Sequence, residues 1–159
     1  PVVVNLFYRE LGFVVAPDNP LGIETFADLT GTEVRFINRQ QGAGTRVLLD
    51  YHLQKLNIPG GKITGYEREV FTHFEVGLAI LSREADVGIA TSAISKLLGL
   101  SFVPITRESF DMILNKNVFF DNGIQALIEI LNSAGFRTRV ANLGNYDFNK
   151  SGKIIYSIN

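Results

Sequence analysis

The chain has no cysteine, few charges of either sign and no long apolar run. The absence of Cys from the 159 residues excludes disulfides, thiolate zinc sites and cysteine nucleophiles, and it leaves the redox compartment open. Charged residues make up 19% of the chain and the formal net charge is −1, so no overall field attracts nucleic acid or an anionic membrane. No apolar stretch approaches the roughly 18 residues of a membrane-spanning helix. We therefore predict no direct nucleic acid contact and no membrane segment.

Motifs of known catalytic and cofactor sites are also missing. The only histidines, His52 and His73, are not in a metal-ligand spacing, and no Gly-x-Ser-x-Gly or His-Glu-x-x-His run occurs. Nothing in the sequence assembles a nucleophile, a base and a group to orient the base. We expect no metal, no cofactor and no catalytic residue here, although membership of a larger enzyme stays open.

What the chain does contain is an alternation of strand and helix patterns. Hydrophobic residues make up 46% of it, enough for a sizeable core in one domain. The alternation predicts an α/β fold with a mostly parallel sheet and helices on both faces, a three-layer αβα lobe. The expected strands are Val2–Phe7, Phe13–Ala16, Val34–Ile37, Asp86–Ala90, Phe102–Ile105 and Phe110–Leu114; the expected helices are Thr25–Leu29, Thr45–Leu56, one from Thr72, Ser92–Leu98, and two late ones around Ile124–Leu131 and Phe136–Leu143.

An Arg-Glu step followed by an apolar strand occurs twice, at Arg9-Glu10 and at Arg107-Glu108, on either side of a strand-and-helix block. We predict that the two segments are outgoing and returning strands that join two lobes; a chance match of two residues is the alternative. The expected division is a first hinge-crossing strand over 1–17, a ligand-binding lobe over 18–105, and a return strand with C-terminal helices over 106–159.

The segment Gly42-Ala43-Gly44-Thr45-Arg46 follows a predicted strand and opens a predicted helix. Glycines allow a sharp bend there, and the first amides of a helix have no partner inside it, which suits phosphate, carboxylate or another oxyanion. The segment is neither a Walker A loop nor a dinucleotide fingerprint. A plain tight turn with Thr45 as the helix cap is the alternative, and Arg39 and Arg46 beside it are either anion ligands or ordinary surface arginines.

A second candidate anion site is the helix start at Thr72-His73. Here Thr72 and Glu75 have the spacing of a capping box, which explains both residues without a ligand. Asp86 is at the start of a predicted strand and is either an acid in a cleft or, as we expect, a turn residue at the strand edge.

The chain resembles the type II periplasmic-binding-protein-like domain attached to molybdopterin-biosynthesis proteins of the molybdenum-insertase type and to helix-turn-helix regulators. It is similar at a lower level to molybdate and tungstate transport receptors. The resemblance covers nearly the whole chain in order, and the element Asn-Arg-Gln…Gly-x-Gly-Thr-Arg is its most specific part. It is carried by 8–23, 35–50, Gly65-Tyr66 with Glu69, Thr72-His73, 85–89, 102–105 and Asn145-Tyr146-Asp147.

The resemblance implies a ligand held between two lobes by helix starts and loop amides. The residues that it marks as ligand-binding are Arg39, Gln40, Gly42, Gly44, Thr45, Arg46, Thr72 and His73. Where relatives can have serine between the loop glycines, this chain has Ala43, which removes one hydroxyl donor. The first lobe is largely absent from this chain, so we expect half a site and weak binding. We also expect the apolar surface that this leaves uncovered near Val2–Phe7 and Phe110–Leu114 to be buried by another chain or by the C-terminal helices.

The function that the resemblance implies is a sensor or substrate-binding domain for an oxyanion such as molybdate or tungstate, linked to molybdenum cofactor biosynthesis or its regulation. The expected partners are that small anion, an upstream domain of the same polypeptide and, to cover the apolar surface, a homodimer. The expected location is cytoplasmic. Two alternatives stay open: the tail of a molybdenum-cofactor transferase with catalysis elsewhere, and a periplasmic transport receptor.

Overall fold

The computed structural model describes residues 1–157, which form two compact units. Unit 1 contains residues 1–10 and the chain from 107 onward, and unit 2 contains Leu11–Thr106. Two long strands, β1 (Val2–Val15) and β5 (Ser101–Leu114), are neighbours in one sheet, and the division between the units falls inside both. The chain therefore leaves unit 2 at two points, each inside a continuous strand.

The sequence analysis was wrong to interrupt these strands. Tyr8-Arg9-Glu10 is polar but extended, because β6 (Tyr146–Asp147) pairs with it in the register Tyr8↔Asp147 and Arg9↔Tyr146. Ion pairs of Arg9 with Glu108 and of Arg107 with Asp147 satisfy the charged side chains at these positions. Polar residues thus continue the strands because their backbone and side chains find partners in neighbouring strands.

The sheet of unit 2 is only partly parallel. Its strand order is β3-β2-β4-β1-β5, where β2 is Phe36–Arg39, β3 is Glu69–Val70 and β4 is Val87–Thr91. Strand β2 is parallel to β3 and β4, but β1 is antiparallel to β4. The prediction was wrong about β1 because the residue pattern shows that Phe13–Val15 is extended but does not set the direction of the strand beside it, which is β4.

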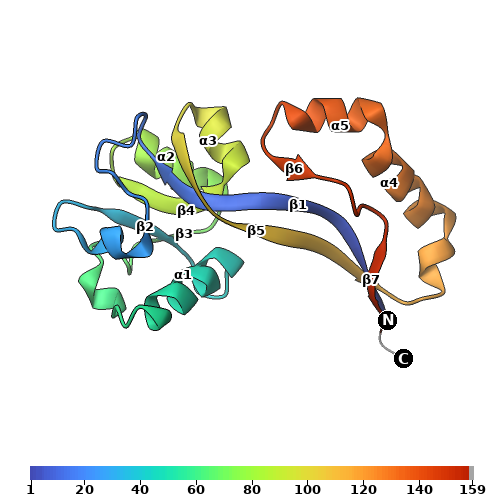
Figure 1. The fold of residues 1–159 in the computed structure, drawn as a ribbon, viewed down its shortest axis with the longest axis horizontal. Helices are drawn as coiled ribbons and strands as arrows, with labels where there is room; N and C mark the ends of the chain where they lie inside the picture. The colour runs from blue at the N-terminus through green and yellow to red at the C-terminus, as the bar shows by residue number, and fades with distance from the viewer. Residues whose placement is uncertain (158–159) are drawn as a thin grey trace. The chain divides into compact units, whose positions relative to one another are not determined.

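Helices cover both faces of this sheet, which confirms the predicted three-layer αβα fold (Figure 1). On one face, the 3-10 helix η1 (Phe26–Thr30) and α1 (Gly44–Lys55) pack with Phe13, Phe36 and Val87 in a core cluster. On the other, α2 (His73–Leu81) and α3 (Ser92–Leu98) pack over Val14, Ile37 and Ala90. Successive strand residues, such as Phe13 and Val14, point to opposite faces of the sheet and so enter different clusters, as expected for a pleated strand. A further 3-10 turn, η2, spans Gly60–Lys62.

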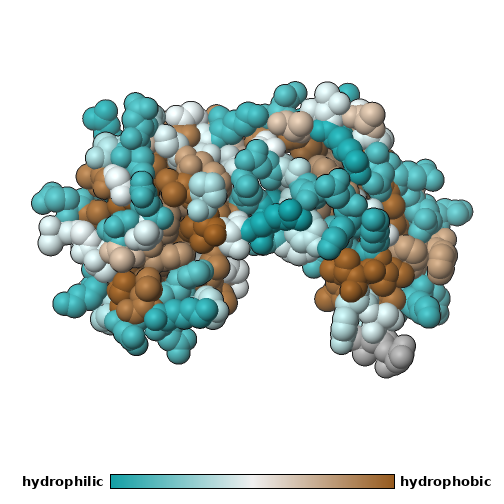
Figure 2. Space-filling model, in the orientation of Figure 1, coloured by the Kyte–Doolittle hydropathy of each residue, from teal (hydrophilic) through white to brown (hydrophobic). Residues whose placement is uncertain are grey.

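Unit 1 adds β6, β7 (Ile154–Ser157), a 3-10 turn η3 (Val118–Phe120) and the helices α4 (Asn122–Asn132) and α5 (Ala134–Ala141) to its parts of β1 and β5. The inner side of Val2–Phe7 is covered within the chain: β7 pairs with Val2–Val4, and Val2 is 1% and Val4 0% exposed. Ile113 in β5 is 74% exposed, as expected for that strand. Figure 2 shows hydrophobic surface on unit 1 where β5 and β7 lie.

Within residues 1–157, no helix combines the length and the apolar character needed to cross a membrane.

Candidate functional site

Two predicted ligand-binding segments meet at one edge of the unit 2 sheet. Strands β2, β3 and β4 are parallel, and α1, α2 and α3 begin just after their carboxyl ends. The Gln40 amide donates to the Val70 carbonyl at 3.2 Å, and the Arg39 guanidinium donates to the Phe71 carbonyl at 2.9 Å. The structure thus places the segments Arg39–Arg46 and Thr72-His73 side by side at the edge where open α/β sheets bind ligands.

The start of α1 is open and has no side-chain cap. Gly42 has a φ of 86°, in the left-handed region, and the cap position is Ala43, so the alternative of Thr45 as cap is wrong. A Cβ built on Gly42 or Gly44 would have no atom within 4 Å. Among the described residues, no carbonyl or side chain accepts a hydrogen bond from the amides of Gly44 and Thr45. These amides, with the positive end of the helix dipole, are free to bind an anion.

The Thr45 side chain lies in the first turn of α1. The residue is 5% exposed, and its Oγ1 atom is buried without a hydrogen-bond partner among the described residues. A buried hydroxyl without a partner costs roughly 1–3 kcal/mol, and native structures contain few of them. Thr45 therefore holds an unused donor beside the unused amides.

Arg46, the next residue, is held by protein groups. Its side chain is 5% exposed and makes ion pairs with Glu69 at 3.0 Å and with Asp50 at 3.3 Å. Its guanidinium carbon lies 4.2 Å from the centre of the Tyr66 ring, and the Tyr66 hydroxyl donates to Asp50 at 2.7 Å. Burial, followed by that bond to Asp50, raises the pKa of Tyr66, which stays protonated. The Arg46 charge is thus balanced inside the protein.

Arg39 and Gln40 form the rim of the loop. Both side chains are partly exposed, and Arg39 Nε donates to Gln40 Oε1 at 3.2 Å. Arg39 also belongs to the groups that lower the pKa of Glu75, after the hydrogen bond from Thr72, which has the largest effect. Arg39 is thus a positive charge on the rim.

The start of α2 is closed by its own capping box, as the sequence predicts. The Thr72 hydroxyl accepts from the Glu75 amide at 3.1 Å, and the Glu75 carboxylate accepts from the amides of Phe71 and Thr72 at 2.9 and 2.7 Å. Glu75 therefore fills the position that an anion would take at this helix. Thr72 and His73 adjoin the α1 loop, and the capping box accounts for Thr72 and Glu75 without a ligand.

The sequence analysis did not assign Asp50, Tyr66 and Glu69 to the site, although all three lie in the segments that carry the resemblance and frame the site in the structure. Asp50 had a detectable pattern, because it lies four residues after Arg46 on one helix. Glu69 follows Arg46 by 23 positions, a pairing that only the β2–β3 register creates. Within residues 1–157, no group of three or more His, Asp or Glu side chains is placed to hold a metal ion.

A three-layer lobe with an open helix start at the carboxyl ends of its parallel strands defines a class of small-ligand-binding α/β protein. The model of the PBP superfamily domain matches residues 1–132, and the chain belongs to this family. The chain is 32% identical over 154 residues to the uncharacterized protein YvgK of Bacillus subtilis; the match covers 96% of the chain and 49% of YvgK. The chain thus spans about half the length of that relative.

Solved structures show the same fold at lower identity. PEB3 with bound L-phospholactate is 19% identical with a TM-score of 0.62, over 91% of this chain and 68% of that one; Peb3 is a Campylobacter jejuni protein. The substrate-binding domain of a putative molybdenum ABC transporter from Clostridium difficile is 20% identical with a TM-score of 0.56, over 92% of this chain and 66% of that one. Both are type II periplasmic-binding-protein folds.

Proposed function

We propose that this chain is a ligand-binding domain that holds a small oxyanion, molybdate or tungstate, at the start of α1. The observation that carries the proposal is the buried Thr45 hydroxyl without a partner, beside the unused amides of Gly44 and Thr45. Three donors at one helix start, with open space at Gly42 and Gly44, suit the oxygens of a tetrahedral anion.

The proposed roles of the eight predicted residues differ. Gly42 and Gly44 let the anion approach the backbone, and Thr45 donates from its hydroxyl and amide. Arg39 and Gln40 contribute charge and polarity on the rim, where Thr72 and His73 adjoin the loop. Arg46 stabilises the loop through its ion pairs with Asp50 and Glu69 and its contact with the Tyr66 ring.

The chemistry of these donors favours a fully ionised oxyanion. Amides and the Arg39 guanidinium only donate hydrogen bonds, and the Thr45 hydroxyl can donate. A protonated oxyanion, such as hydrogen phosphate, needs an acceptor for its own proton, whereas molybdate, tungstate and sulfate do not. The fold shared with the molybdenum transporter domain supports this choice, and the bound L-phospholactate of PEB3 shows that a structure of this fold holds a small anion.

The fold relatives favour a second candidate, a receptor of a transport system, because the C. difficile domain is described as the substrate-binding domain of an ABC transporter. The first candidate, a cytoplasmic domain linked to molybdenum cofactor biosynthesis or its regulation, rests on the sequence resemblance. In both, an upstream part of the same polypeptide supplies a second lobe. Reading the chain upstream of Pro1 separates them: a cleavable signal peptide supports the receptor, and a basic helix-turn-helix supports regulation.

Calorimetric titration with molybdate, tungstate, sulfate and several amino acids tests the proposal. We expect the oxyanions to bind this chain weakly, in the millimolar range. Thr45→Val should weaken binding about tenfold or more, because it removes one hydrogen bond to a charged group. Thr64→Val is the matched control and should leave the affinity unchanged. Thr64 is exposed, and its carbonyl accepts from the Phe36 amide at the start of β2, whereas the loop follows the end of that strand. Heat from an amino acid, with none from any oxyanion, would reject the oxyanion assignment.

A further inference from the structure

Unit 2 has a second concave site, at the sheet edge opposite the α1 loop. A cavity of about 310 Å³ opens where β1 ends and where β2 and β4 begin, under the C-terminal end of α2. Its apolar walls include Val15, Ala16, Leu21, Ile80 and Ala85. The volume and the largely apolar lining are those of small-molecule sites, which combine apolar walls with a few polar groups.

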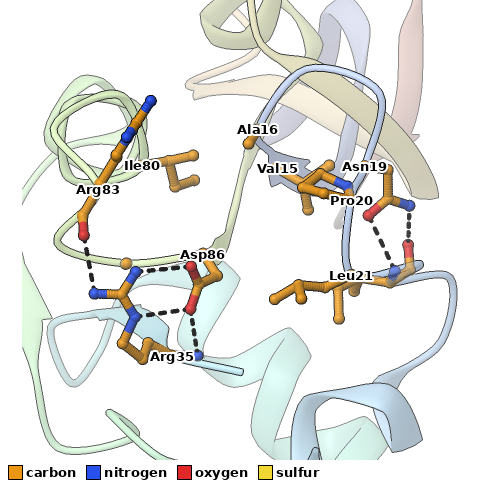
Figure 3. Close-up of a pocket in the computed structure, with 11 residues that line it drawn as sticks. Val15, Ala16, Asn19, Pro20, Leu21, Arg35, Ile80, Arg83 and Asp86 are labelled. Carbon is orange, nitrogen blue, oxygen red and sulfur yellow. Dashed lines mark hydrogen bonds and ion pairs between the residues drawn. The ribbon is translucent and has the colours of Figure 1, made fainter. Parts of the chain in front are cut away.

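The charged groups of this cavity are two arginines and one carboxylate, and Asn19 is a further polar residue of its lining. Arg35 Nε and NH2 donate to the Asp86 oxygens at 2.9 and 2.8 Å, and Arg35 NH1 donates to the Arg83 carbonyl at 2.9 Å (Figure 3). The guanidinium of Arg83 has no described partner, and the neighbouring Glu84 pairs with Arg68 instead. The lining therefore carries one positive charge that no carboxylate matches.

The backbone at Arg83 is also unusual. Arg83 follows the end of α2 with a φ of 61°, in the left-handed region, where glycine is the common residue after a helix. A side chain costs stability in this conformation, so glycine would serve the helix end better. Nothing in the packing of the described residues requires an arginine here, since its guanidinium makes no described contact.

We infer that this cavity binds a small organic carboxylate with an apolar body, of the size of phenylacetate or isovalerate. The apolar walls take the hydrocarbon part, and Arg83 pairs with the carboxylate. Arg35 also lines the cavity, and Asp86 fixes its orientation. This site is separate from the oxyanion site, because its residues lie at the opposite ends of β2 and β4.

Phenylacetate is the probe, and its uncharged isostere phenylacetamide is the matched control ligand. Titration of the chain followed by amide NMR shifts should show saturable changes at residues such as Ala16, Arg35 and Ala85. Arg83→Gln should weaken phenylacetate binding about tenfold, because it removes a charge-assisted pair. Lys62→Gln, which removes an exposed positive charge of the same unit that does not line the cavity, should leave it unchanged.

Arg83→Gly separates binding from folding. It should lose affinity as Arg83→Gln does, while its melting temperature stays at or above that of the parent chain, because glycine relieves the left-handed backbone. Equal affinity for phenylacetamide, unchanged affinity in Arg83→Gln, or shifts confined to Gly42–Arg46 would each overturn the inference. None of these results touches the oxyanion proposal, which Thr45→Val tests by itself.

Discussion

Replacement of Arg46 by alanine separates a supporting role from direct ligand contact. The Arg46 side chain is 5% exposed, and its guanidinium is shared among Glu69, Asp50 and the Tyr66 ring. The substitution removes these contacts and a hydrogen bond to the Arg39 carbonyl, and it leaves the carboxylates of Asp50 and Glu69 without the arginine that pairs with them. We expect the main effect on the stability of unit 2, with a smaller effect on anion binding through the loosened loop.

The size of the effect follows from the surroundings of each contact. A desolvated cation–π contact is worth about 1–2 kcal/mol. The two ion pairs count for less, about 0–1 kcal/mol each, because the side chains of Asp50 and Glu69 are 45% and 32% exposed. Lost packing of the buried aliphatic stem adds to this. We therefore expect a loss of about 2–4 kcal/mol in the free energy of unfolding.

Urea denaturation measures this loss. With a slope of about 2 kcal/mol/M, the midpoint should fall by about 1–2 M. Arg46→Lys should lose part of this, because lysine keeps the charge but not the planar fork that stacks on Tyr66. Arg68→Ala, whose pair with Glu84 is exposed and 3.8 Å long, should change stability by less than about 0.5 kcal/mol. An unchanged midpoint in Arg46→Ala together with abolished oxyanion binding would refute the supporting role and make Arg46 a ligand.

Three further predictions follow from the structure. Gly65→Ala should lower the free energy of unfolding, measured by urea denaturation, by more than about 2 kcal/mol. Gly65 has a φ of 94°, and a Cβ there would lie 2.0 Å from the Phe36 carbonyl oxygen. Gly61→Ala is the control, because the space around Gly61 is open. Hydrogen bonds from Arg35 hold the pKa of Asp86 below its usual 3.8, so Asp86→Asn should lower the free energy of unfolding at neutral pH. This loss of stability should shrink as the pH falls below 3.8, where the native carboxylate becomes protonated. A loss that does not change with pH would contradict the role of the ionised Asp86 carboxylate. Exposed apolar side chains, among them Ile113, Ile154 and Ile155, lie in unit 1, so light scattering should show that the chain associates with itself. Ile113→Lys should reduce this self-association. A chain that stays monomeric at high concentration would count against this surface as an interface.

Local patterns predicted the helices well because their determinants are close in sequence. The box of Thr72 and Glu75 fixed the start of α2, and α3 has the predicted bounds Ser92–Leu98. The short strand β3 and the terminal β7 were missed, since pairing with β2 and β1 creates them rather than their own composition. The direction of β1 was missed for a related reason: periodicity shows that a residue run is extended but not which way its neighbours point.

The same distinction between local and distant determinants divides the candidate site. The open helix start was predictable, because two glycines after a strand produce it whatever surrounds them. The sequence did not predict that the Arg46 side chain has partners inside the protein while the Thr45 hydroxyl has none, since both residues are polar, adjacent and buried. Glu69 and Tyr66 come to Arg46 from the β3 region, whereas no described group reaches the Thr45 hydroxyl. Arg46, the charged residue of the motif, can therefore stabilise the loop, while the hydroxyl of Thr45 remains available to donate a hydrogen bond to a ligand.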